Sequence, residues 1–189
     1  MKVYFSAAIV QKEVFGKTYG KIVKLLKDEG HDLFQDTTEV SLQEVMNKSD
    51  DQRVRYYKKV LKWIAKADVV VLETSFPSTL HIGHEISLAS QKGKPVVALY
   101  MKGHEPSFFL GREDEKLFWV EYEEDNVIDE LKYALKLASE AMDTRFNFFI
   151  SPKIANFLDW VSKTKRLPRA VYLRNLIQDK MEADKEYQS

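Results

Sequence analysis

Over roughly the first 140 residues, short continuous hydrophobic runs alternate with longer stretches of helical spacing. The run at 69–72 (VVVL) is typical of a central parallel strand covered on both faces. Phe15, Tyr19, Ile22 and Leu26 recur at the interval of an amphipathic helix. The pattern predicts strands at 2–8, 31–34, 69–72, 95–101 and 117–122, and helices at 15–29, 51–66, 82–91 and 127–142. The polar segments 35–50 and 102–116 lack a clear period and are predicted to be loops.

The order of these elements, β-α-β-α-β-α-β-β-α, indicates an α/β fold with a doubly wound five-stranded parallel sheet. Right-handed crossovers favour the strand order 2-1-3-4-5. In open sheets of this kind ligands bind in a crevice at the carboxyl ends of the strands, and we expect the functional site there.

The balance of acidic and basic residues changes near residue 144. Residues 1–144 hold 20 basic and 24 acidic residues, whereas residues 145–189 hold 9 basic and 5 acidic ones. The second segment begins with a strand-like stretch at 145–150 and continues with two amphipathic patterns, 152–163 and 168–184, each opening with proline. We therefore predict a domain at 1–143 and a small strand-helix-helix appendage at 144–189.

Composition narrows the functional classes. Hydrophobic content is 44% and charged content 31%, as expected for a folded core beneath a charged surface. The formal net charge is zero, so bulk charge favours neither a nucleic-acid nor a membrane partner. The absence of cysteine excludes disulfides and cysteine-ligated zinc. With no signal-peptide pattern and no apolar run long enough to cross a bilayer, we expect a cytoplasmic protein without membrane contact.

The candidate chemistry lies after the third predicted strand. Glu85 falls in the opening turns of the following helix, where its carboxylate can point into the crevice and attack an anomeric carbon. The alternative is a solvated helix glutamate. Ser75, Ser78 and Thr79 lie in the preceding loop and are suited to bind a sugar hydroxyl or a phosphate. Neighbouring His81 and His84 match no standard zinc spacing, so we predict no metal and no cofactor.

Three blocks of residues carry a resemblance to a known family: VYFSAAI at 3–9, ADVVV at 67–71 followed by Pro77-Ser78, and GHEISLA at 83–89. Here the sequence resembles the nucleoside 2-deoxyribosyltransferase superfamily, and within it the 2′-deoxynucleoside 5′-phosphate N-hydrolases. The resemblance implies a flavodoxin-like fold, cleavage of a nucleoside N-glycosidic bond, and a homodimer or larger oligomer with shared active sites. It implies that Glu85 is the nucleophile and that Tyr4 positions it.

The same resemblance assigns substrate contacts. Ser78 matches a serine that binds phosphate or sugar, and Ser107 matches a serine that a neighbouring subunit lends to the phosphate. Ser6, at the end of the first strand, and His84 complete the expected substrate-binding set with Ser75.

The chain also departs from the family pattern. An acidic residue that assists protonation of the departing base is usual eight positions before Asp68, where this chain has Val60. The alternatives for that role are Asp50, Asp51 and His84. The first loop has Ala7-Ala8 where the family tends to have Gly-Ser, and alanine restricts close approach of the backbone to a ligand.

Residues 145–181 resemble a ribbon-helix-helix module, in which paired strands read DNA. The candidate DNA contacts are Arg145, Asn147, Arg166 and Arg169. The alternative is a segment that only dimerises or caps the sheet.

Two functional hypotheses remain open. The first is cleavage or transfer of the N-glycosidic bond of a nucleoside or nucleoside 5′-monophosphate through a covalent glycosyl-Glu85 intermediate. The second is a catalytically impaired nucleotide-sensing domain joined to a DNA-binding or dimerising segment.

Overall fold

The computed structural model describes residues 1–106, 114–142, 148–165 and 169–184. The chain divides into two compact units, Met1–Asp143 and Thr144–Ser189. Among the described residues, no helix is long and apolar enough to cross a membrane.

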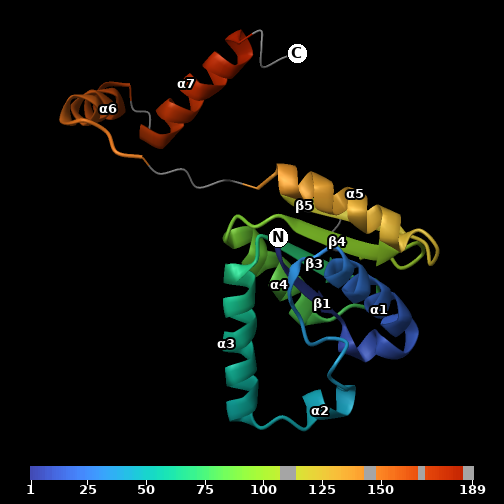
Figure 1. The fold of residues 1–189 in the computed structure, drawn as a ribbon. Helices are drawn as coiled ribbons and strands as arrows, with labels where there is room; N and C mark the ends of the chain where they lie inside the picture. Colours follow the sequence, from blue (N-terminus) through green and yellow to red (C-terminus); the bar gives the residue numbers. More distant parts are fainter. Residues whose placement is uncertain (107–113, 143–147, 166–168, 185–189) are drawn as a thin grey trace. The chain divides into compact units, whose positions relative to one another are not determined.

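The first unit is built on a five-stranded parallel sheet (Figure 1). Its strands are β1 (Lys2–Ala7), β2 (Asp32–Phe34), β3 (Val69–Glu73), β4 (Val96–Met101) and β5 (Leu117–Tyr122). They lie in the order β2-β1-β3-β4-β5, which confirms the fold predicted from the hydrophobic pattern. Chain order reverses between β1 and β3, whose ends are aligned because Ala7 pairs with Glu73. A ligand crevice is expected at this point.

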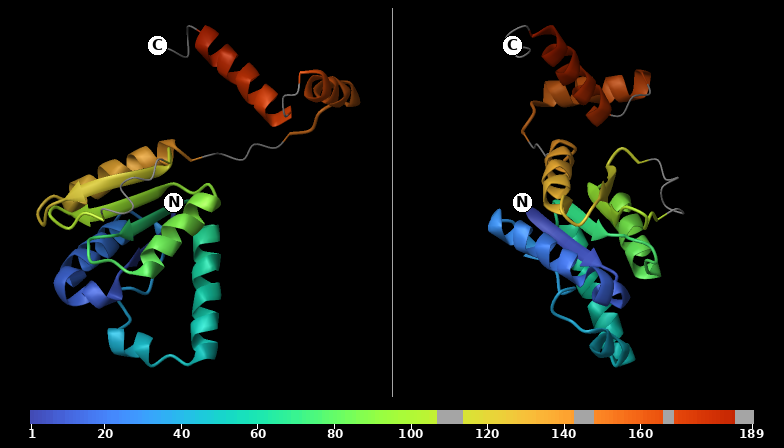
Figure 2. Two further views of the ribbon diagram at one scale, coloured as in Figure 1. Left: turned by 180° about the vertical axis from the view of Figure 1, so that it is seen from behind. Right: turned by 90° about the vertical axis from the view of Figure 1, so that its right-hand side faces the viewer.

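Helices cover both faces of the sheet (Figures 1 and 2). On one face lie α1 (Lys12–Asp28) and α5 (Val127–Glu140), and on the other lie α3 (Asp50–Lys66) and α4 (Leu80–Gln91). The 3-10 turn η1 (Ile9–Gln11) joins β1 to α1.

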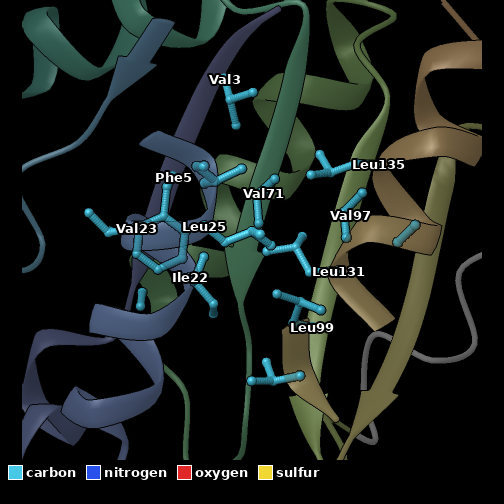
Figure 3. Packing of buried hydrophobic residues seen from close by; sticks show 14 of the residues in the cluster. Val3, Phe5, Ile22, Val23, Leu25, Val71, Val97, Leu99, Leu131 and Leu135 are labelled. Carbon is cyan, nitrogen blue, oxygen red and sulfur yellow. The ribbon is translucent and has the colours of Figure 1, made fainter. Parts of the chain in front are cut away.

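Alternate strand residues point to opposite faces and produce two cores. Figure 3 shows the first core, in which Val71, Val97 and Leu99 of the sheet pack against α1 and against Leu131 of α5. The second core joins Tyr4 and other strand residues to the inner sides of α3 and α4. Full burial of each such aliphatic side chain stabilises the fold by roughly 1.5–3 kcal/mol, so the sheet is a rigid base for the loops at its edge.

The sequence predicts one continuous loop over the polar segment 35–50, and the structure shows that this prediction is wrong for part of the segment. It contains the short helix α2 (Leu42–Met46), which a capping box stabilises: Glu44 N–H donates to Ser41 Oγ (3.2 Å) and Ser41 N–H donates to the Glu44 carboxylate (2.7 Å). Ser49 and Gln52 form a second capping box at the start of α3. Figures 1 and 2 show α3 extending past the sheet, with α2 near its first turn.

The second unit contains α6 (Pro152–Thr164) and α7 (Arg169–Ala183). Ser151 Oγ accepts a hydrogen bond from Ile154 N–H, and Pro152 occupies the first turn of α6. The predicted strand at 145–150 falls partly outside the described residues, and its described part, 148–150, is not a strand. A strand needs a pairing partner for its backbone groups, and the described part of the single chain offers none here.

Candidate active site

A cavity of about 600 Å³ lies at the carboxyl end of β1, beside the point where strand order reverses. The end of β1 with η1, and the helices α2, α3 and α4, supply its lining residues. Glu85 is the only carboxylate among the described lining residues, while Lys48, Arg53, His81 and His84 contribute cationic or titratable nitrogen groups. The volume is typical of sites that hold small molecules.

Glu85 sits in the second turn of α4 with only 8% of its surface exposed. The alternative of a solvated helix glutamate is therefore wrong. Burial raises the pKa of this carboxyl from 4.5 to about 7; hydrogen bonding with Ser6 and Tyr4 lowers it, and the charge of Asp36 raises it further. Its Oε2 atom is buried without a hydrogen-bond partner among the described residues. A buried carboxylate oxygen without a partner, in a residue that lines a cavity, is a candidate contact for a ligand bound there.

Tyr4 and Ser6 approach Glu85 from β1. Tyr4 is buried, and the combination of burial and the nearby Glu85 charge raises the pKa of its phenol well above the ordinary value. Tyr4 therefore stays protonated and can donate to the carboxylate. Ser6 lines the cavity at the exit of the same strand. The structure thus brings three of the predicted residues together.

Ser75 and Ser78, both of which we expected to bind substrate, do not line the cavity. Ser75 is 1% exposed; its hydroxyl donates to the Glu73 carboxylate and accepts from Met101 N–H (2.8 Å). These bonds hold it inside the protein. Ser78 is exposed, and its neighbour Thr79 lines the cavity instead. Thr79 is the N-cap residue of α4, but its side chain makes no capping bond.

Glu73 is a second buried carboxylate, and it belongs to the core rather than to the cavity. Burial raises its pKa, whereas hydrogen bonds from Ser75 and from the Tyr122 hydroxyl (2.9 Å) lower it. The bonds from Ser75 and Tyr122 converge on Glu73 Oε1, so Glu73 braces the ends of β3 and β5.

The position that carries an acid in the family lies on the cavity wall. Val60 projects from α3 there and is 5% exposed. Asp50 and Asp51 do not line the cavity: the Asp50 side chain is 98% exposed and pairs with Arg53 (3.7 Å). His84 does line it, and its Nε2 atom lies 3.2 Å from the Tyr57 hydroxyl, with the two rings stacked at 5.9 Å.

Sequence reasoning missed a polar cluster beside the site. Tyr56 lines the cavity one helical turn before Val60, and its hydroxyl donates to Asp36 Oδ1 (3.0 Å). Lys59 pairs with the other oxygen of Asp36 (3.0 Å). The charge of Asp36 raises the pKa of Glu85, although Asp36 itself does not line the cavity. Asp36 lies within a segment predicted to be an irregular loop, and no motif marked it.

Four of the predicted site residues lie in segments that the structure does not describe. Ser107, Arg145, Asn147 and Arg166 lie outside the described residues. Arg169 is described, and its guanidinium forms an ion pair with Asp159 inside the second unit. Within the described residues, no cluster of three or more His, Asp or Glu side chains is placed to hold a metal ion.

No family model matches this sequence. A protein named as 2′-deoxynucleoside 5′-phosphate N-hydrolase 1 in Syntrophotalea carbinolica is 30% identical over 105 residues, which cover 56% of this chain and 72% of that protein. The 5-hydroxymethyl-dUMP N-hydrolase of Rattus norvegicus is 30% identical over 98 residues, covering 52% of this chain and 60% of the rat protein. The structure of CMP N-glycosidase BcmB from Clostridium botulinum is similar in fold, with a TM-score of 0.50 and 16% identity over 72% of this chain and 98% of that one.

Proposed function

Because this chain belongs to the nucleoside 2-deoxyribosyltransferase-like superfamily, we propose that its first unit is an enzyme that cleaves the N-glycosidic bond of a nucleoside 5′-monophosphate. One observation carries the proposal most directly. Glu85 is a buried carboxylate with one oxygen unpaired among the described residues, in the wall of a cavity at the reversal point of the sheet. The names of the relatives, which are N-hydrolases of 5′-phosphates, support the same reaction class.

The proposed mechanism proceeds through a covalent intermediate. A Glu85 oxygen attacks C1′ of the sugar, forming a C1′–O ester bond as the C1′–N bond breaks and its electron pair moves to the base. Water then attacks C1′ and gives up a proton as the C1′–O bond to Glu85 breaks, which releases the sugar phosphate and the free carboxylate. Tyr4 and Ser6, whose hydroxyls act on the carboxylate and lower its pKa, orient it for attack. A second nucleobase in place of water would give transfer instead of hydrolysis.

The charge of the cavity supports a phosphorylated substrate over an uncharged nucleoside. Lys48 and Arg53 line one part of it, and the first turn of α4, with Thr79 at its start, lines another. Cations and helix N-termini both attract phosphate. Ser78, exposed just before this turn, and Ser107 from a neighbouring subunit remain proposed phosphate contacts that depend on the family resemblance.

We further propose that His84 protonates the departing base. Histidine is the side chain that most often acts as the general acid in enzymes. Of the three alternatives for the missing acid, His84 alone lines the cavity, and Tyr57 fixes its ring through the contact at Nε2. His84→Ala should lose activity on natural nucleotides but keep most of it on a 4-nitrophenyl glycoside of the same sugar phosphate, whose leaving group needs no proton. Equal losses on both substrates would refute this role.

The proposal as a whole is tested with Glu85→Ala. Purified wild-type and variant chains are incubated with deoxyribo- and ribonucleoside 5′-monophosphates, and free base is measured by liquid chromatography. The wild type should release base and Glu85→Ala should not, while an exposed glutamate on α1 changed in the same way, Glu13→Ala, should leave turnover intact. Undiminished turnover by Glu85→Ala would end the assignment.

The second candidate function is nucleotide sensing without turnover, and it is favoured by Val60 at the position of the usual acid. In that case nucleoside monophosphates bind the wild type, as measured by calorimetry, but no base is released after prolonged incubation. The second unit would then pass the signal on by binding duplex DNA or by dimerising. A salt-titrated gel shift tests the DNA proposal, since phosphate contacts give strongly salt-dependent affinity.

Homodimer formation through the second unit has support from its surface. Phe149 is fully exposed, and Trp160 and Ile177 are 53% and 60% exposed. Large apolar side chains left on a two-helix unit favour association, because so small a unit cannot bury them alone. Light scattering on the full chain and on residues 1–143 tests this: loss of the dimer upon truncation supports the second unit as its cause, and an unchanged mass contradicts it.

A further inference from the structure

A row of exposed cations runs along α3 on a side of the helix that does not line the active-site cavity. Its members are Arg55, Lys58, Lys59, Lys62 and Lys66. They border a groove of about 380 Å³ that shares no lining residue with the cavity around Glu85. We call it the α3 basic groove. It is independent of the proposed enzymatic function.

The charge of this row is concentrated and largely uncompensated. Residues 52–67 contain six basic residues and no acidic one, although the whole chain has a net charge of zero. Lys59 pairs with Asp36, whereas Arg55, Lys58, Lys62 and Lys66 form no ion pair with a described residue. A solvated helix surface in a chain with equal numbers of acids and bases normally mixes the two signs, which reduces repulsion. The row instead creates a strip of positive potential.

The spacing of the row suits an extended polyanion. Intervals of three, four and seven residues place these side chains on one side of the helix. From Arg55 to Lys66 the row extends for about 17 Å at 1.5 Å per residue. A linear strip of this length can contact several successive phosphates of one strand, whereas a single phosphate group would engage only part of it.

Two aromatic rings lie in the same groove. Phe34 of β2 and Trp63 of α3 stack at 6.4 Å with an interplanar angle of 16°, and both are partly exposed. Lys59 Nζ lies 4.2 Å from the centre of the Trp63 ring. Aromatic surfaces among cations are the arrangement with which proteins hold single strands, because an unpaired base stacks on the ring while its phosphate meets a cation. Bases within a duplex are already stacked and cannot do this.

We propose that the α3 basic groove binds single-stranded nucleic acid, with backbone phosphates on the cation row and a base against the Phe34–Trp63 pair. The recognition is independent of sequence, because both the phosphates and the faces of the bases are common to all nucleotides.

The test measures binding of the full chain to a fluorescein-labelled 20-nucleotide oligo-dT by anisotropy between 50 and 300 mM salt. The logarithm of the affinity should fall linearly with the logarithm of salt concentration. Replacing Lys58, Lys62 and Lys66 together by alanine should reduce that slope by about 2, since each lost phosphate contact on a single strand removes roughly 0.7. The matched control replaces three exposed lysines of α1, Lys17, Lys24 and Lys27, and should keep the wild-type slope.

A second variant separates stacking from charge. Phe34→Leu should weaken binding about tenfold at every salt concentration without changing the slope, and Phe34→Tyr should restore it. Thermal melting confirms that each variant is folded. Absence of binding at 50 mM salt, wild-type binding by the triple α3 variant, or equal affinity for a duplex of the same length would each overturn the proposal.

Discussion

Replacing Glu85 by glutamine should stabilise the protein at alkaline pH and not at acidic pH. Glu85 is held in a buried site where its pKa is about 7, against 4.5 for an ordinary glutamate. Below pH 4.5 the carboxyl is protonated in both the folded and the unfolded chain, so its burial carries no charge penalty. Between pH 4.5 and 7 the unfolded chain ionises first, and folding becomes less favourable as the pH rises. Above pH 7 the penalty is complete. Glutamine has no such dependence.

The magnitude follows from the two pKa values. A pKa difference of one between the folded and the unfolded chain corresponds to about 1.36 kcal/mol of folding free energy. The difference between 4.5 and about 7 therefore amounts to about 3 kcal/mol. For a protein of this size 1 kcal/mol shifts the melting temperature by about 2–4 °C. As the pH rises from 4 to 8, the melting temperature of Glu85→Gln should therefore rise by about 6–12 °C relative to that of the wild type. Glu73, whose pKa is also raised by burial, is unchanged in both proteins, and its contribution cancels from the comparison.

The assay is urea denaturation of both proteins at half-unit steps from pH 4 to pH 9, followed by the intrinsic fluorescence of the tryptophans. The free-energy difference should rise from pH 4.5 and level off above pH 7. A difference that stays constant over the whole range would refute the reasoning, because Glu85 would then have an ordinary pKa and would not be desolvated. A part of the free-energy difference between the two proteins that does not vary with pH reflects only how well the glutamine amide fits in the site.

Three further outcomes are expected from the fold. Leu131→Ala, which opens a cavity in the first core, should cost about 2–5 kcal/mol in urea denaturation, and a loss below 1 kcal/mol would contradict the packing shown in Figure 3. Tyr122→Phe, which deprives the buried Glu73 of a 2.9 Å hydrogen bond, should cost about 1–3 kcal/mol, and an unchanged stability would show that the bond contributes little. Ser49→Ala removes the N-cap of α3 and should cost about 1 kcal/mol, while no loss would mean that the capping box is not maintained in solution.

The sheet could be predicted because each strand has a local hydrophobic pattern that identifies it. Runs such as VVVL at 69–72 are continuous only when both faces are covered, and the alternation of strands and helices then leaves few topologies. The helix α2 was missed although the sequence carries its signal: Ser41 and Glu44 have the spacing of a capping box. A five-residue helix is too short for a hydrophobic period to appear.

The site was only partly predictable, since its properties depend on contacts across the chain. The place of Glu85 on its helix followed from local order, but its burial requires Tyr4 and Ser6 from a distant strand. Ser75 and Ser6 looked equally suited to bind substrate, but hydrogen bonds to Glu73 and from Met101 hold Ser75 inside the protein, away from the cavity. The Asp36–Tyr56 pair joins residues 20 positions apart and has no sequence motif.

The central claim, that Glu85 is the nucleophile, is tested most directly by trapping the covalent intermediate. The wild type is mixed with a deoxynucleoside monophosphate that yields free base, the reaction is stopped with acid within its first turnover, and the digested protein is examined by mass spectrometry. The account predicts one peptide, containing Glu85, that is heavier by a sugar phosphate residue, and no such adduct in Glu85→Gln. An adduct on any other residue, or full turnover by Glu85→Gln, would contradict it.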